Sequence, residues 1–297
     1  MKLTYDISDI RPYINWPYFD YAWSMSGKQG EEKDRLRADA EAMLDAWEGR
    51  YHTHALFRLL DANSDDDDLL IYGSNGDKGS LVERRSPLDS RAYQARHTLT
   101  RIPLLRQQQP STPGAPCLCL ADFVRPLSQG IKDRVGIFCT TVDAAIEHDY
   151  QGDVYQRMLS QTLADRLAEG TAERMHLEVR RRYWGYAPDE DLSMADIHAE
   201  HYQGIRPAIG YPSLPDTSVN FVLNDLLDMK QVGIRLTESG MMQPHASVSG
   251  LMFAHPKAHY FDLGKIGEDQ LRDYARRRGI PVEMMRRFLQ SSILRKP

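Results

Sequence analysis

A short proline-bracketed segment carries the side chains best suited to hold a charged small molecule. It reads Arg206-Pro207-Ala208-Ile209-Gly210-Tyr211-Pro212. Proline fixes φ and lacks an amide donor, and glycine permits tight turns, so this segment fits neither a helix interior nor a central strand. The planar guanidinium of Arg206 matches a carboxylate, and Tyr211 offers an apolar ring with a polar tip. The pattern predicts a stiff loop that binds a carboxylated ligand with little loss of conformational entropy.

Each of these side chains also has an ordinary structural role open to it. Arg206 could instead tie down its own loop through backbone carbonyls, and a lone tyrosine such as Tyr260 usually packs against its neighbours. Asp165 and Glu169 lie four residues apart, so they share one face of a helix. They form either a solvated polar edge beside neighbouring arginines or a pair of carboxylates aimed at a cationic ligand group.

Two pairs of histidines are the candidates for metal binding. His198 and His201 lie three residues apart, and His255 and His259 lie four apart. Pro256 opposes a helical pairing of the second couple, and the chain has no His-Glu-x-x-His motif. Gly-x-Ser-x-Gly, Cys-x-x-Cys and glycine-rich phosphate-binding motifs are also missing. The sequence therefore predicts no metal site and disfavours phosphoryl transfer, serine hydrolysis and thiol redox chemistry.

The composition is that of an ordinary globular protein. The 297 residues are 41% hydrophobic and 27% charged, with a net charge of −5. This acidic balance argues against binding to nucleic acid, and no apolar run is long enough for a signal peptide or a membrane span. Cys117 and Cys119 alternate with leucines, as in the apolar filling of a strand. The three cysteines cannot all pair, and a reducing cytoplasm is the expected location.

Hydrophobic periodicity and turn residues predict the elements that position these side chains. Helices are predicted over 31–47, 155–183, 193–202, 218–229, 267–278 and 281–294. Strands are predicted over 54–60, 69–72, 117–124, 135–141, 233–237, 246–253 and 260–263. Hairpin-linked strands with helices grouped around them indicate an α+β fold with an antiparallel sheet.

Several segments between these elements have their own signals. The aromatic residues of 10–19 predict an ordered N-terminal arm, and Gly170 predicts a bend in the long helix. The acidic run 65–68 indicates a hairpin tip rather than a calcium loop, whose glycine and terminal glutamate are missing. The polar, proline-bearing segment 107–116 is the best place for a domain boundary, if the chain has one.

The arginine loop and its flanking motifs resemble a known family. The segments that carry the similarity are Tyr13-Ile14-Asn15-Trp16, Leu120-Ala121-Asp122-Phe123-Val124, Leu163-Ala164-Asp165-Arg166-Leu167-Ala168-Glu169, Tyr183-Trp184-Gly185-Tyr186, the arginine loop itself, Ala246-Ser247-Val248-Ser249-Gly250 and Phe253-Ala254-His255-Pro256. In this order they resemble the C-terminal reactivation domain of cobalamin-dependent methionine synthase, and the similarity extends over most of the chain.

The resemblance implies a fold, a function and partners. It implies a single curved α+β domain over 1–297, with an N-terminal arm and helix in 1–50 and a central twisted antiparallel sheet flanked by helices in 51–297. Such domains bind S-adenosylmethionine and close over the cobalamin of a neighbouring module. An electron from flavodoxin, followed by methyl transfer from S-adenosylmethionine, then restores the cofactor. No homocysteine, folate or cobalamin module is recognised, so a separate cobalamin-binding methyltransferase lacking this domain is the expected partner.

The resemblance also implies the residues that hold S-adenosylmethionine. Arg206 would clamp the methionine carboxylate. Ala208 would offer main-chain contacts at the adenine end, with Tyr211 beside it. Tyr260 and the backbone of Phe261 would form the second wall of the site.

Further residues would act on the charged and corrin-facing sides. Glu169 would face the ligand's charged portion, Glu200 would lie near the corrin, and Asp165 would help hold the histidine released from cobalt. The chain departs from the family at Asn15, where an aspartate is usual, so a charge–charge contact with the ligand's ammonium would be lost. It departs again at 213–217, where the family has a cysteine and an acidic–histidine pair.

These departures favour a second hypothesis. The chain could be a non-catalytic module that senses S-adenosylmethionine or docks on a corrinoid protein without supporting reactivation. A methyltransferase acting on another acceptor is a weaker third possibility, because the chain lacks a Rossmann-type glycine loop.

Overall fold

The computed structural model describes residues 1–73 and 98–294. Residues 74–97 and 295–297, which the predicted single domain also includes, lie outside this description. The chain divides into two compact units, the first made of Met1–Arg58, Phe138–Tyr202 and Leu223–Gly250, the second of Leu59–Ile137, Gln203–Val222 and Leu251–Pro297. The proposed boundary at 107–116 therefore falls inside the second unit. That both units act as one domain stays a prediction.

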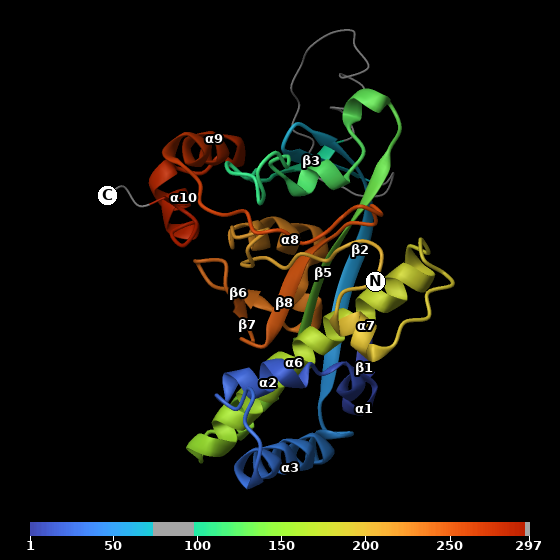
Figure 1. Ribbon diagram of the computed structural model, residues 1–297, viewed down its shortest axis with the longest axis vertical. Coiled ribbons are helices and arrows are strands. Elements are labelled where there is room, and N and C mark those ends of the chain that lie inside the picture. Colours follow the sequence, from blue (N-terminus) through green and yellow to red (C-terminus); the bar gives the residue numbers. More distant parts are fainter. Residues whose placement is uncertain (74–97, 295–297) are drawn as a thin grey trace. The chain divides into compact units, whose positions relative to one another are not determined.

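A central antiparallel sheet of six strands, flanked by helices, confirms the predicted fold class (Figure 1). The strands run in the order β4-β3-β2-β5-β8, and β1 also pairs with β2. Their bounds are β1 Lys2–Asp6, β2 His52–Asp65, β3 Asp68–Tyr72, β4 Thr98–Pro103, β5 Asp133–Val142 and β8 Ser247–Met252. β2, β5 and β8 each continue from one unit into the other. β1 was not predicted; its five residues are defined as a strand by their pairing with β2.

The predicted hairpin tip between β2 and β3 is confirmed. Asp65 pairs with Asp68 across a two-residue turn in which Asp66 has a φ of 52°. The carboxylates of this tip meet arginines, because Arg101 contacts Asp65 at 2.8 Å and Asp68 at 2.6 Å. Arg106 contacts Asp67 at 2.6 Å in the same way.

The first unit holds a set of helices and helical turns, some of which form the N-terminal arm itself. They are α1 Ile7–Ile10, the 3-10 turn η1 Arg11–Tyr13, α2 Trp16–Ala22, α3 Glu31–Trp47, α5 Ala145–Asp149, α6 Val154–Glu178, the π-helical segment η4 Val179–Tyr183, α7 Met194–His198 and the 3-10 turn η5 Met229–Val232. α3 has the bounds that the sequence predicted. Ile10, Ile14 and Phe19 are buried, so the arm is ordered as expected.

Gly170 lies at the contact between α6 and the N-terminal arm, and the bend predicted at this residue stays a prediction. A Cβ atom at Gly170 would lie 3.0 Å from Cγ2 of Ile10 and 3.4 Å from the backbone of Tyr13. The missing side chain thus allows the arm to approach α6 closely.

Two predicted strands of the second unit are wrong. Residues 117–124 form an isolated bridge and the 3-10 turn η2 Leu120–Phe123, because the Asp122 carboxylate accepts the amide of Cys119 at 2.8 Å and closes the chain into a turn. Cys119 is nevertheless buried, as its apolar neighbours suggested. Residues 260–263 are irregular, with the Leu263 amide bonded to the Pro212 carbonyl at 3.1 Å.

The other predicted elements agree with the structure in type and differ in length, whereas β4, β7 (Met242–Gln243), α5 and the helices of the N-terminal arm were not predicted. The second unit also holds the 3-10 turn η3 Leu127–Gln129, α9 Glu268–Arg278 and α10 Val282–Phe288, and α8 Val219–Leu227 crosses the division. Gly279 ends α9 with a φ of 66°, as the helix-stop signal indicated. The predicted strand 233–237 is the short β6 Arg235–Leu236, paired with β7 Met242–Gln243.

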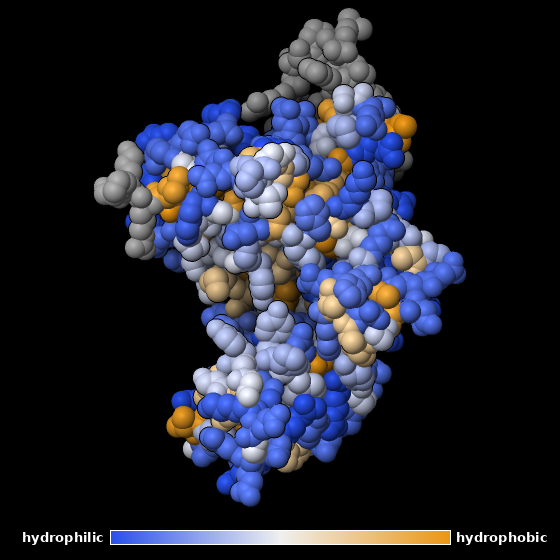
Figure 2. Space-filling view, viewed as in Figure 1, coloured by the Kyte–Doolittle hydropathy of each residue, from blue (hydrophilic) through white to orange (hydrophobic). Residues whose placement is uncertain are grey.

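The surface in view is mostly hydrophilic, and hydrophobic residues are scattered over it (Figure 2). Across the described ranges, no helix combines the length and the apolar character that a bilayer crossing requires. In the same ranges, no group of three or more His, Cys, Asp or Glu side chains is arranged to hold a metal ion.

Candidate functional site

The arginine loop is fixed at its start by strand-like contacts within the second unit. Ile205 and Phe253 exchange both backbone hydrogen bonds at 2.9 Å. Two residues further, the Pro207 carbonyl accepts the amide of Leu251 at 3.1 Å. These bonds hold both sides of Arg206, so its backbone is well ordered before any ligand arrives.

The end of the loop closes on itself. Gly210 has a φ of 90°, a conformation that strongly favours glycine, and its amide bonds to the Leu214 carbonyl at 2.8 Å. Pro212 is tied to Leu263 through its carbonyl. As the sequence predicted, the segment is neither helix nor strand.

The structure brings Arg206 and Tyr260 into direct contact. The backbone amide of Arg206 donates to the Tyr260 hydroxyl at 2.9 Å, and both residues are half-buried. The amide of Tyr211 donates to the Ala208 carbonyl at 3.3 Å, and the Tyr211 side chain is 53% exposed. The predicted carboxylate clamp and a residue of the predicted second wall, 54 residues apart in sequence, therefore meet at one place.

Phe261, the neighbour of Tyr260 in the sequence, belongs to an aromatic cluster. The ring of Phe123 lies 6.4 Å from those of both Phe253 and Phe261. The His255 ring lies tilted against the same Phe123 ring at 6.2 Å, and the His259 ring meets it edge-on at 5.9 Å. These two histidines, considered above for metal binding, therefore pack on an aromatic side chain.

The acidic pair of α6 faces basic partners within the first unit. Glu169 accepts from Arg166 at 2.8 Å, which agrees with the compensated polar edge considered for this face. Asp165 lies 3.5 Å from the ring of His245. Burial raises the pKa of Asp165, and the nearby His245 and Arg166 partly oppose this rise.

Asn15 and Glu200 occupy the ends of short helices. The Asn15 carbonyl accepts the amides of Tyr18 and Phe19 at 3.2 and 3.3 Å at the start of α2. Glu200 is exposed after α7 and has a φ of 59°. The ligand and corrin roles that the resemblance implies for Asn15, Glu200, Asp165 and Glu169 stay predictions.

The first histidine pair has separate partners. His198 bonds through Nε2 to the Tyr13 carbonyl at 3.2 Å. His201 bonds through Nδ1 to Asp196 at 3.2 Å. The two histidine rings therefore bond to different protein partners.

A buried polar network at the π-helical segment was missed from the sequence. Arg180 is fully buried and pairs with Glu190 at 2.6 Å. Its guanidinium donates to Nδ1 of His176 at 2.9 Å and lies 4.1 Å from the Tyr202 ring. Because Nδ1 accepts, the His176 proton resides on Nε2, which lies 3.4 Å from the Tyr186 hydroxyl. A signal existed, since residues 176 and 180 continue the buried stripe of α6, but Arg180 opens a run of three arginines typical of a solvated face.

The arginine loop belongs to an α+β fold built on a central antiparallel sheet. Among solved structures, the chain is similar to a crystal structure of the MetH reactivation domain bound to AdoHcy. The two are 36% identical and superpose with a TM-score of 0.87, and the similarity covers 100% of this chain and 90% of the other. The profile of the family described as vitamin B12 dependent methionine synthase, activation domain, matches residues 6–279. The chain belongs to this family, which confirms the resemblance seen in the sequence.

Proposed function

We propose that this chain binds S-adenosylmethionine and supports the reductive reactivation of a corrinoid methyltransferase. The observation that carries the proposal is the arginine loop, fixed by the bond from the Arg206 amide to Tyr260. A similar domain with bound AdoHcy supports a ligand of this class. The cobalamin belongs to a partner module, and a flavodoxin-like protein supplies the electron, in the cytoplasm.

The residues of the loop fit the amino-acid and nucleoside ends of such a ligand. The Arg206 guanidinium would pair with the ligand's carboxylate, whose planar shape it matches. The Ala208 main chain and the exposed ring of Tyr211 meet the adenine, and Tyr260 with Phe261 forms the opposite wall.

The chain contributes position and electrostatics rather than a base or a nucleophile. When bound to its own module, reduced cobalamin supplies the nucleophile that accepts the methyl group. The stiff loop of this chain holds the methyl donor in one orientation and lowers the entropy lost on reaching the reactive geometry.

Calorimetric titration with S-adenosylmethionine tests the binding. Arg206→Ala should weaken binding by about 2–4 kcal/mol, because a charge-assisted contact is removed. Arg276→Ala is the matched control, since Arg276 lies in the same unit and is 75% exposed. Absence of binding at millimolar ligand would refute the proposal, and unchanged affinity in Arg206→Ala would mean that another residue is the anchor.

A second candidate function is binding without reactivation. The departure at 213–217 favours it, because Asp216 is only 1% exposed and faces inward. Its carboxylate accepts the hydroxyls of Tyr274 and Ser218 at 2.8 Å each, so it serves the core rather than a partner. Reconstitution with a cobalamin-bearing methyltransferase, a reductant and a labelled methyl donor separates the two functions. Methyl transfer to cobalamin supports reactivation, and binding alone supports the sensor.

A further inference from the structure

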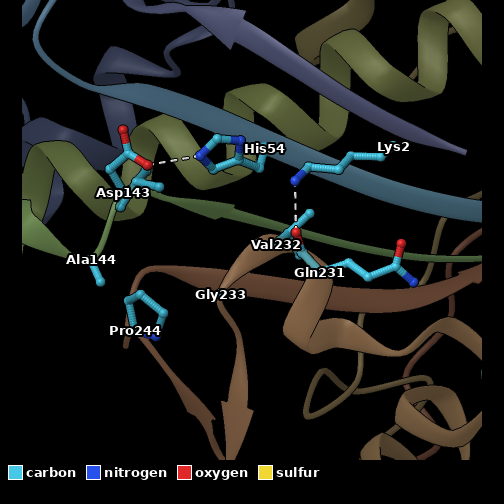
Figure 3. A pocket seen from close by; sticks show the side chains of 9 residues that line it. Lys2, His54, Asp143, Ala144, Gln231, Val232, Gly233 and Pro244 are labelled. Atoms are coloured by element: carbon cyan, nitrogen blue, oxygen red, sulfur yellow. Dashed lines mark hydrogen bonds and ion pairs between the residues drawn. The ribbon is translucent and has the colours of Figure 1, made fainter.

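A second site candidate is a cleft of about 220 Å³ that lies wholly within the first unit. Its lining comes from β1, β2, the end of β5 with the two residues after it, the end of η5 with Gly233, and the residue after β7. The lining residues are Lys2, His54, Val142, Asp143, Ala144, Gln231, Val232, Gly233 and Pro244 (Figure 3). Pockets for drug-sized ligands usually exceed about 300 Å³, so this cleft suits a smaller molecule.

His54 is already committed to protein partners. Its Nε2 bonds to Asp143 at 2.8 Å, and its Nδ1 bonds to the hydroxyl of Thr4, the residue opposite it on β1, at 3.2 Å. Both ring nitrogens are used, so His54 presents only its carbon edge and face to the cleft. In the view of Figure 3 the His54 ring lies between Asp143 and Lys2.

Lys2 and Asp143 have hydrogen-bonding capacity for a ligand. The Lys2 ammonium donates to the Gln231 carbonyl at 2.7 Å, which uses one of its three N–H groups within the described part of the chain. Asp143 accepts from His54 and from the His52 amide at 2.8 Å, with the His52 ring 3.6 Å away. A carboxylate offers about four acceptor sites, so it can still accept from an ammonium group. A cation and an anion therefore border one small cleft.

The rest of the lining is largely apolar. Val142, Val232 and Pro244 are buried, and Ala144 is exposed at the edge. Gly233 adds open space, because a Cβ atom built there would have no neighbour within 4 Å. Such walls gain from covering a hydrocarbon side chain.

We propose that this cleft binds a small apolar α-amino acid, with its carboxylate at Lys2 and its ammonium at Asp143. The ligand's two charges match the two charges of the cleft, and its side chain packs on Val142, Val232 and Pro244. This site is separate in sequence from the arginine loop and does not depend on the function proposed for that loop.

The requirement for both charges of the ligand is tested by titrating the full chain with L-leucine and measuring binding by NMR or calorimetry. Two probes each remove one charge: 4-methylpentanoate lacks the ammonium, and 3-methylbutylamine lacks the carboxylate. Leucine should bind at least tenfold more tightly than either probe. Equal binding of 4-methylpentanoate would reduce the cleft to an anion site and overturn the proposal, as would absence of leucine binding.

Variants locate the site. Lys2→Met and Ala144→Phe should each weaken leucine binding at least tenfold, the first by removing a charge and the second by filling the cleft with every charge intact. Lys28→Met is the matched control, because Lys28 is an exposed lysine of the same unit outside the lining. Unchanged leucine affinity in both test variants would overturn the proposal.

A crossed measurement keeps the two binding sites distinct. Arg206→Ala should leave leucine affinity unchanged, and Lys2→Met should leave S-adenosylmethionine affinity unchanged. Loss of leucine binding in Arg206→Ala would place the amino acid at the arginine loop and overturn the assignment to the cleft.

Discussion

The Tyr260 hydroxyl holds the backbone of the residue that we expect to grip the ligand. Tyr260→Phe removes the acceptor of the Arg206 amide while keeping the ring. Leaving a partly buried donor without this acceptor should lower the free energy of unfolding by about 1–3 kcal/mol and weaken S-adenosylmethionine binding. Denaturant unfolding and calorimetry measure the two effects. Tyr21→Phe, at a side chain that is 75% exposed, should change neither, and an unaltered Tyr260→Phe protein would contradict the role.

Asp165 makes stability depend on pH in an unusual direction. Burial raises its pKa in the folded protein, so the native state binds the proton more tightly than the unfolded chain does. The stability that this gives is present at pH below the unfolded pKa and is lost as the pH rises through the folded pKa. Asp165→Asn should therefore gain stability relative to the wild type at about pH 7 and lose that advantage toward about pH 4.

Asp196 provides a control, because its pKa is shifted in the opposite direction to that of Asp165. Hydrogen bonds from Ser193 and His201 lower the pKa of Asp196, so its contribution is present at neutral pH and is lost on acidification. Asp196→Asn should be less stable than the wild type at neutral pH, and the difference should shrink in acid. Parallel pH profiles for the two variants would contradict both assignments.

At the scale of elements, the packing of the arm on α6 depends on Gly170. Gly170→Ala improves helix propensity by about 1 kcal/mol, yet the new methyl group would meet Ile10 at 3.0 Å. Overpacking of this kind costs about 1–3 kcal/mol, so we expect a net loss of stability in denaturant unfolding. Gly152→Ala is the control, because a Cβ there meets nothing within 4 Å. A stabilised Gly170→Ala protein would show that the arm yields easily.

Elements with a strong local sequence pattern could be predicted, whereas elements that depend on contacts with other residues could not. Periodicity gave α3, and Gly279 marked the end of α9. The apolar alternation at 117–124 misled, because the Asp122 carboxylate caps a turn there, a contact that periodicity does not reveal. β1 is defined by residues about 50 positions away.

In the candidate site, too, the features set by local sequence could be predicted and those set by distant residues could not. The stiffness of the arginine loop follows from its prolines and glycine, which act locally. The family resemblance placed Arg206 and Tyr260 in one site, but the bond from the Arg206 amide to the Tyr260 hydroxyl was not predicted, because no local rule links the two residues. The cleft at Lys2 was missed altogether, since its charges come from segments that only the sheet brings together.

At the scale of the whole molecule, three strands continue through both compact units, and this predicts cooperative unfolding. Melting either unit would unravel strands of the other, so we expect one transition. All four tryptophans, Trp16, Trp23, Trp47 and Trp184, belong to the first unit. Tryptophan fluorescence therefore reports that unit, and far-UV circular dichroism reports the whole chain.

The two signals should change at the same denaturant concentration. Gly170→Ala, which alters only the first unit, should shift both midpoints equally. Two separated transitions would mean that the units are independent domains and would contradict the single domain proposed for this chain.

The loop is tethered through the main-chain amide of residue 206, and every amino acid except proline possesses that group. The anchorage is therefore indifferent to side-chain identity at this position. Saturation mutagenesis at position 206 can therefore test which analogues of the proposed ligand are accepted while the loop stays in place, so this position is a suitable starting point for engineering altered selectivity.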